Sequence, residues 1–161
     1  MQFIERNEIE EWCREHGIVL SKDSKPMPDV TLMHQSCIVY ANGQRSGQES
    51  NIALRCVRAL GPWQECLLYV TLWGIWGSGE DWPKYYAARG KRGERRSIEK
   101  APGHLFGAEE GEDMIEFLTL VLENAWDAHL LPVPKAKTKT VRLTISHDEW
   151  VEARSSEAVS L

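Results

Sequence analysis

The amino-acid sequence predicts one α+β domain, with a mixed or antiparallel sheet of about four to six strands packed against about three to five helices. Helical stripes and strand-like apolar runs both occur, but they do not alternate in the regular cadence of a doubly wound sheet. The 161 residues suffice for one substantial core and are too few for two comfortable domains. We therefore expect a single domain over residues 1–154, followed by a frayed polar tail over residues 155–161.

The N-terminal part is expected to begin with a helix. Asn7 and Glu10 have the spacing of a capping box, and Gly17 follows as a stop, which predicts a helix over 7–16. Periodicity and turn residues then indicate a short strand, a loop, a longer strand and a polar loop, over residues 18–20, 21–29, 30–41 and 43–50. A second helix, capped by Ser50 or Asn51, is predicted up to the Gly61-Pro62 pair, with a strand as the alternative.

Residues 62–90 hold the densest set of structural signals. The unbroken apolar run from Cys66 to Val70, extended to Trp76, is typical of a central strand that is covered on both faces. Ser78 stands three residues before Asp81, which is the spacing of a helix N-cap with an acidic first turn. We expect a strand, a glycine turn and then a helix that starts near Gly79 and stops near Gly90.

The C-terminal part is expected to add one long helix and two strands. The broad apolar stripe over residues 111–126 predicts the helix. Residues 129–133 and 141–145 have strand patterns, whereas residues 91–97, 101–104 and 134–140 are expected to be loops or turns. Ser146 and Glu149 have capping-box spacing, which predicts a short helix at the end of the chain.

The composition of the chain indicates the class of protein and its expected cellular location. Hydrophobic residues make up 42% of the chain and charged residues 27%, as in an ordinary soluble protein. The apolar stretch from Cys66 to Gly79 is shorter than the roughly 20 residues needed to span a bilayer, and the acidic N-terminus does not resemble a signal peptide. We therefore expect a cytoplasmic protein without a membrane partner.

The seven Trp residues are interpreted as core, with an aromatic partner surface as the alternative. The four widely spaced Cys residues are interpreted as reduced and inert.

Charge is distributed unevenly along the chain. Seven of the 19 basic residues but only two of the 24 acidic residues lie between positions 84 and 100, although the net charge is −5. This asymmetry predicts a protein-interaction module without catalytic activity, of a binding, accessory or immunity-like kind, that docks a partner with an acidic surface. The predicted surface combines exposed aromatics, the glycine loop and the basic Arg89–Arg96 segment, at Trp76, Gly77, Ser78, Gly79, Trp82, Arg89, Arg92, Arg95 and Arg96.

The glycine loop at Gly74–Gly79 allows an alternative function. Its GxxGxG spacing matches neither the dinucleotide fingerprint nor the Walker motif, so a plain tight turn is the simpler interpretation. Backbone N–H groups at a helix start do bind phosphates, however, and downstream arginines can close over an anion while Trp76 and Trp82 stack on a base. A domain that binds a nucleotide, a phosphate or nucleic acid is therefore the first alternative.

A metal-assisted enzyme is the second alternative. Asp127 and His129 would share one face of a strand, and His104 or His147 could complete a metal site with them. The chain has no HExxH motif, and the adjacent Ser146-His147-Asp148 cannot converge as a catalytic triad. We therefore expect no metal and no cofactor, and we regard binding as a better explanation of the sequence than catalysis.

Overall fold

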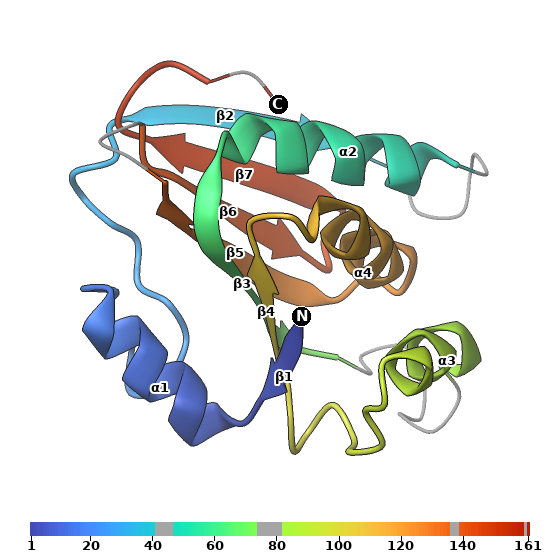
Figure 1. The fold of residues 1–161 in the computed structure, drawn as a ribbon. Coiled ribbons are helices and arrows are strands. Elements are labelled where there is room, and N and C mark those ends of the chain that lie inside the picture. The colour runs from blue at the N-terminus through green and yellow to red at the C-terminus, as the bar shows by residue number, and fades with distance from the viewer. Residues whose placement is uncertain (41–46, 74–81, 136–138, 160) are drawn as a thin grey trace.

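The computed structural model describes residues 1–40, 47–73, 82–135, 139–159 and 161. Within these residues the chain forms four helices and one seven-stranded sheet (Figure 1). The helices are α1 (Arg6–Glu15), α2 (Gln48–Leu60), α3 (Pro83–Lys91) and α4 (Gly111–Glu123). The strands are β1 (Gln2–Ile4), β2 (His34–Val39), β3 (Trp63–Leu72), β4 (Gly103–Gly107), β5 (Asp127–Pro134), β6 (Val141–Ser146) and β7 (Trp150–Ser155). The predicted α+β class is confirmed, with more strands than expected.

Every neighbouring pair of strands in the sheet is antiparallel, in the order β1-β4-β3-β5-β6-β7-β2. The ten-residue strand β3 contains the predicted run from Cys66 to Val70 and lies between β4 and β5. All five residues of that run are buried, which explains why its sequence is continuously apolar rather than alternating. The middle position of the sheet belongs to β5, and β1 and β2 form the two edges.

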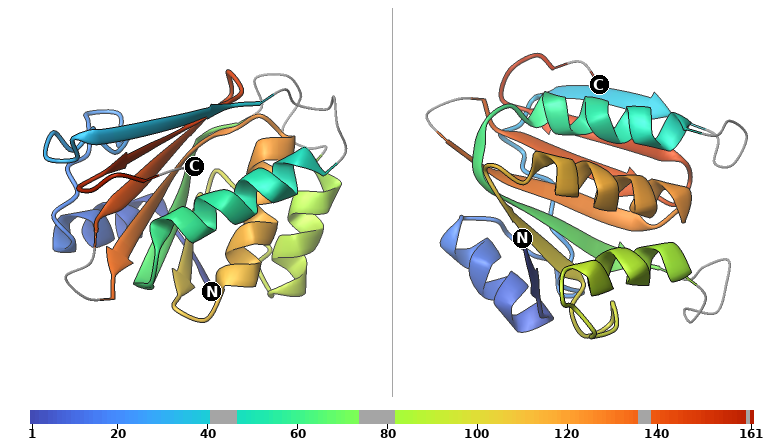
Figure 2. Two further views of the ribbon diagram at one scale, coloured as in Figure 1. Left: turned by 90° about the horizontal axis from the view of Figure 1, so that it is seen from above. Right: turned by 45° about the vertical axis from the view of Figure 1, so that its right-hand side comes forward.

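Two separate layers cover the faces of the sheet. Helices α2, α4 and α3 lie side by side on one face, whereas α1 lies on the other (Figure 2). Cys66, Leu68 and Val70 belong to the larger core beneath the three helices, and Leu67 and Tyr69 belong to the smaller core beneath α1. The period-two alternation of β3 therefore divides its side chains between two cores.

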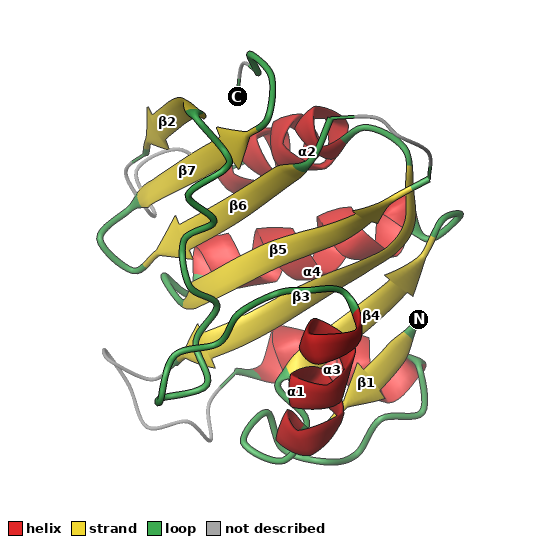
Figure 3. Ribbon diagram, turned by 90° about the vertical axis from the view of Figure 1, so that its left-hand side faces the viewer, coloured by secondary structure: helices red, strands yellow, loops and turns green. Residues whose placement is uncertain are grey.

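The face that carries α1 is only partly covered by helix. Figure 3 shows this face, with α1 in front of one end of the sheet and the connection from α1 to β2 crossing the strands. We call residues 18–33 of this connection the strap. It has an isolated bridge between Leu20 and Pro26 but no regular strand, so the short strand predicted over 18–20 is reduced to a single pair.

Three sequence predictions need correction at the level of elements. The turn predicted at 101–104 leads directly into β4, and the Ser146–Glu149 pattern belongs to a turn between β6 and β7 rather than to a helix cap. The Ser146–Glu149 pattern is ambiguous because polar caps and hairpin turns use the same residue types, whereas Gly103 and His104 of the predicted turn are the first two residues of β4. The strand predicted over 30–41 is shorter, at His34–Val39. Helix α3 begins at Pro83, and the predicted start near Gly79 lies outside the described residues.

The end of the chain contacts the domain. Ser155 is the last residue of β7, and Leu161 is buried in the core beneath α2 and α4. Arg55 of α2 donates a hydrogen bond to the main-chain oxygen of Leu161. Among the described helices, none is both long and apolar enough to cross a bilayer.

Candidate functional site

The structure places Arg89 of the predicted docking surface inside the protein. Its side chain is 0% exposed, and its guanidinium group donates hydrogen bonds to the Tyr85 hydroxyl at 2.9 Å and to the carbonyl oxygens of Ala101 and Arg96 at 3.1 Å. The guanidinium carbon also lies 4.5 Å from the ring centroid of Phe3. Arg89 therefore joins α3 to β1 and to the segment before β4, and it is not available to a partner.

The neighbouring arginines differ in their availability. Two of them bind carboxylates of the fold, Arg92 those of Asp113 and Glu116 on α4, and Arg96 those of Glu94 and Glu5. Hydrogen bonds and charge attraction from Arg96 lower the pKa of Glu94 to about 2. Arg95, in contrast, is exposed. The basic segment is therefore largely a set of local and long-range ties between α3, α4 and the N-terminus.

The predicted glycine loop at Gly74–Gly79 lies outside the described residues, and with it Trp76, Gly77, Ser78 and Gly79 of the predicted surface. Trp82 is described, and its ring meets the buried Trp126 edge-on, with the ring centroids 4.6 Å apart. Trp82 thus contributes to packing at the start of α3.

The four predicted metal ligands are divided between different parts of the fold. His104 is buried against Tyr85 of α3 and Phe117 of α4, its Nε2 lies 2.8 Å from the Tyr85 hydroxyl, and burial together with Arg89 lowers its pKa to about 3. His129 lies on the opposite face of the sheet, whereas Asp127 and His147 meet each other at 2.8 Å. Across the described parts of the chain, no group of three His, Cys, Asp or Glu residues is suited to hold a metal ion.

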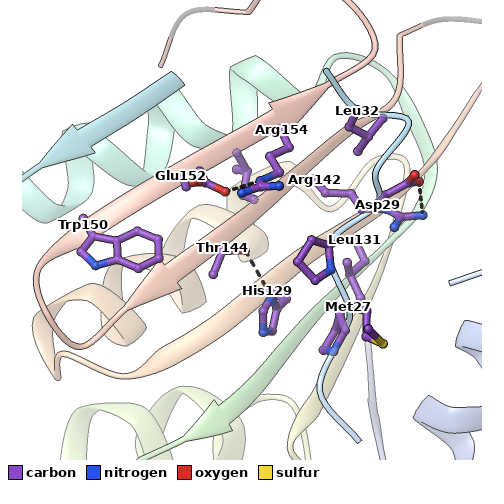
Figure 4. Close-up of a pocket in the computed structure, with 13 residues that line it drawn as sticks. Met27, Asp29, Leu32, His129, Leu131, Arg142, Thr144, Trp150, Glu152 and Arg154 are labelled. Atoms are coloured by element: carbon purple, nitrogen blue, oxygen red, sulfur yellow. Dashed lines mark hydrogen bonds and ion pairs between the residues drawn. The ribbon is translucent and has the colours of Figure 1, made fainter. Parts of the chain in front are cut away.

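A cavity that the sequence did not predict lies between the strap and the sheet (Figure 4). Its volume is about 290 Å³, and we call it the strap pocket. The strap forms one wall, with the residues Pro26, Met27, Pro28, Asp29 and Leu32. Strands β5, β6 and β7 form the floor, whose polar and aromatic residues are His129, Arg142, Thr144, Trp150, Glu152 and Arg154.

Strand alternation explains why these polar side chains gather in one place. Val141, Leu143 and Ile145 of β6 and Val151 and Ala153 of β7 pack in the helix-covered core. The intervening residues must then point to the other face, which carries the strap. The register sets Arg142 opposite Arg154, Thr144 opposite Glu152, and Ser146 opposite Trp150. The floor of the pocket is therefore a regular ladder of cross-strand pairs.

Each arginine of the floor has one carboxylate partner. Arg142 Nη2 lies 3.2 Å from Asp29 Oδ2 of the strap, and Arg154 Nε lies 2.5 Å from Glu152 Oε1 on the same strand. Hydrogen bonds from Thr31 lower the pKa of Asp29, and Arg142 lowers it further. The Asp29–Arg142 ion pair therefore links the strap to β6 across the pocket.

His129 adds an uncharged polar group to the floor. Its Nδ1 lies 3.4 Å from the Thr144 hydroxyl oxygen, at hydrogen-bonding distance. Burial lowers the pKa of His129 to about 4, so the imidazole is neutral near pH 7. A neutral imidazole can both donate and accept a hydrogen bond, which suits the recognition of a polar ligand.

Among the residues that line the pocket, His129 was predicted from the sequence as a candidate site residue, and the others were not. Trp150, Glu152 and Arg154 share one face only if their segment is a strand, and the capping pattern at 146–149 favoured a helix there. The alternating sequence Trp-Val-Glu-Ala-Arg-Ser, with small or apolar residues at every second position, is the signal that could have found them.

Comparisons with known proteins do not identify this site. No protein-family model, curated protein or solved structure matches the chain. The chemistry of the strap pocket rests on its own residues.

Proposed function

We propose that the protein is a binding domain that holds a small organic ligand in the strap pocket. The observation that carries this proposal is the composition of the cavity, in which a few polar groups converge beside apolar walls. Its volume of about 290 Å³ is close to the lower end of the range of about 300–1,000 Å³ that is typical of ligand sites. The proposed ligand is accordingly small.

The strands and side-chain contacts that hold the pocket residues in place favour selective binding. Its polar side chains stand on three paired strands, and Glu152 is held on one side by Arg154 and on the other by the amide of Gln35. Side chains fixed in this way lose little freedom when a ligand arrives, which favours affinity. Met27, which is 47% exposed, gives the site apolar surface that a ligand can cover, and the buried Leu32 and Leu131 lie beside it.

The test is a nuclear magnetic resonance screen of small fragments against the isotope-labelled protein. We expect at least one fragment to shift the resonances of His129 and Thr144, and the variant Thr144→Trp, which fills the pocket, to abolish the shift at His129. Met33→Trp is the matched control, because Met33 is 81% exposed and does not line the pocket. A diverse fragment set that leaves both residues unshifted at millimolar concentration would refute the proposal.

A protein-interaction module is the second candidate function. Val30, Met33 and Val39 are between 78% and 84% exposed, and large exposed apolar side chains favour contact with another protein. Lys91, Arg95 and Lys100 are exposed as well and would suit an acidic partner.

This second function can be tested by cross-linking in the cells that produce the protein. One variant carries Val30→Lys with Met33→Lys, and another carries Glu at positions 91, 95 and 100. We expect a partner captured by the wild type to be lost in at least one of them. An unchanged set of captured proteins in both variants would count against an interaction through either surface.

A further inference from the structure

The strap pocket contains two arginines in an arrangement that sheets ordinarily avoid. Arg142 and Arg154 are directly opposite each other on β6 and β7, and both line the pocket. Like charges at directly opposed positions destabilise a strand pair. Their side chains are also substantially covered, with exposed fractions of 19% and 39%. Two arginine side chains therefore line one small cavity, Arg142 directed toward Asp29 and Arg154 toward Glu152 (Figure 4).

The carboxylate groups of the pocket already interact with other groups of the protein. Glu152 accepts a hydrogen bond from Arg154 at Oε1 and one from Gln35 at Oε2. Asp29 accepts two bonds from Thr31 at Oδ1, and its Oδ2 faces Arg142. Each carboxylate oxygen of the site thus already has a partner.

The guanidinium groups, in contrast, keep spare donors. A guanidinium group has five N–H donors, and only Nε of Arg154 and Nη2 of Arg142 have a carboxylate partner. Within the described residues, no protein acceptor is found for the remaining N–H groups of either arginine. The pocket therefore offers an excess of charged donors, which a ligand rich in acceptors can satisfy.

We propose that the ligand of the strap pocket is a small organic anion whose carboxylate or phosphate group binds Arg142 and Arg154 together. The inference rests on the proposed function above and specifies its ligand. Planar guanidinium groups bind carboxylate and phosphate oxygens in a bidentate manner, which matches the spare N–H groups. The apolar part of the ligand packs against Met27 and Trp150, which line the same cavity and are not fully buried.

Asp29 has a defined role in this arrangement. It is the one carboxylate of the pocket that the strap supplies, and it occupies Arg142, where the anion would bind. An incoming anion must share Arg142 with Asp29 or replace it. Neutralising Asp29 should therefore strengthen anion binding, whereas neutralising Arg154 should weaken it. A pocket that selected its ligand by shape alone would not show these opposite effects.

The experiment measures the dissociation constants of three ring compounds by nuclear magnetic resonance titration at low salt. Benzoate carries a carboxylate, phenyl phosphate carries a phosphate, and benzamide is the neutral analogue of benzoate. We expect at least one anion to bind the wild type about tenfold more tightly than benzamide, as a charge-assisted contact predicts. The tighter of benzoate and phenyl phosphate shows which acidic group the pocket prefers.

The variants Arg154→Gln and Asp29→Asn complete the test. We expect the first to weaken binding of the anion about tenfold and the second to tighten it, with benzamide affected by neither. Thermal unfolding of each variant shows whether it remains folded, and Arg154→Lys should recover part of the affinity. Equal binding of benzamide and the anions, or indifference to Arg154→Gln, would overturn the anion inference and leave the proposed ligand pocket standing. If neither these three compounds nor the diverse fragment set described above shifts the pocket resonances, both proposals fall.

Discussion

Asp127 and His147 are joined by two contacts to one oxygen atom. Oδ1 of Asp127 lies 2.8 Å from the His147 ring nitrogen Nδ1 and accepts the backbone N–H of His147, also at 2.8 Å. The pair connects the start of β5 to the turn between β6 and β7. Both residues belong to the metal site that the sequence suggested as an alternative, and the structure brings these two into contact, whereas His104 is buried against Tyr85.

This pair predicts a pH-dependent contribution to stability. The Asp127 carboxylate raises the pKa of His147, mainly through the side-chain hydrogen bond. A histidine whose folded pKa is raised stabilises the fold fully below its unfolded pKa of about 6.5, and the contribution is lost as pH rises through the folded pKa. We expect His147→Gln to lower the free energy of unfolding at pH 5.5, by an amount that stays below about 1 kcal/mol because the pair is partly solvated. The loss at pH 8.5 should be smaller than the loss at pH 5.5. Urea unfolding at both pH values measures it.

The control for this prediction is His34→Gln. His34 is exposed on the edge strand β2 and has no ion-pair partner among the described residues. Its substitution should have the same small effect at both pH values. Equal losses of stability at pH 5.5 and 8.5 in the His147 variant would show that only its neutral contacts matter.

Arg92 is predicted to stabilise the fold rather than to bind a partner. Its guanidinium group reaches two carboxylates on α4 and lies 5.1 Å from the ring centroid of Phe117. We expect Arg92→Met to lower the free energy of unfolding by about 1–2 kcal/mol, because it removes several charge-assisted contacts at a partly buried site. Arg95→Met is the control and should change stability by less than about 0.5 kcal/mol, since Arg95 is exposed. Similar stability of the two variants would contradict a structural role for Arg92.

The basic Arg89–Arg96 segment shows that a local count of charge does not reveal tertiary ion pairs. Apart from Glu94, the acidic partners of its arginines are distant in the chain, with Asp113 lying 21 positions from Arg92 and Glu5 lying 91 positions from Arg96. A local count of charge therefore indicated an exposed basic surface, although tertiary contacts neutralise much of it. Burial of Arg89 has no local signature either, because its acceptors are a tyrosine hydroxyl and two carbonyl oxygens.

The fold itself was more accessible from the sequence than the site. Apolar periodicity located α1, α2, α4 and the strands β3, β5 and β6, because each buries a continuous stripe or face. It missed β7, whose preceding turn resembles a helix cap, and the loss of this strand removed Trp150, Glu152 and Arg154 of the pocket floor from the prediction. The pairing of Arg142 with Arg154 depends on strand register, which side-chain patterns alone do not specify when the partner strand is unrecognised.

Cysteine reactivity should be restricted to one position. Cys13, Cys56 and Cys66 are buried, whereas Cys37 is exposed on the edge strand β2. Burial raises the pKa of Cys13 to about 11 and that of Cys56 to about 12, which keeps both as unreactive thiols. We expect a thiol reagent to modify the native protein once, at Cys37, and all four cysteines after denaturation. Mass spectrometry of the modified peptides identifies the site, and rapid native labelling of Cys13 or Cys56 would contradict the described packing.

Gly103 is predicted to be required for the packing of α1 against the sheet. A Cβ atom at this position would lie 2.6 Å from Ile4 Cγ1 and 2.8 Å from Ile9 Cδ1, closer than carbon atoms approach without movement. We expect Gly103→Ala to lower the free energy of unfolding by about 1–3 kcal/mol, as overpacking of a core does. Gly90→Ala is the matched control, because a Cβ atom there meets nothing within 4 Å and the residue lies within helix α3. Alanine should stabilise that helix by about 0.5–1 kcal/mol. Denaturant unfolding of the two variants should therefore give shifts of opposite sign, and a stable Gly103→Ala variant would show that Ile4 and Ile9 can move apart freely.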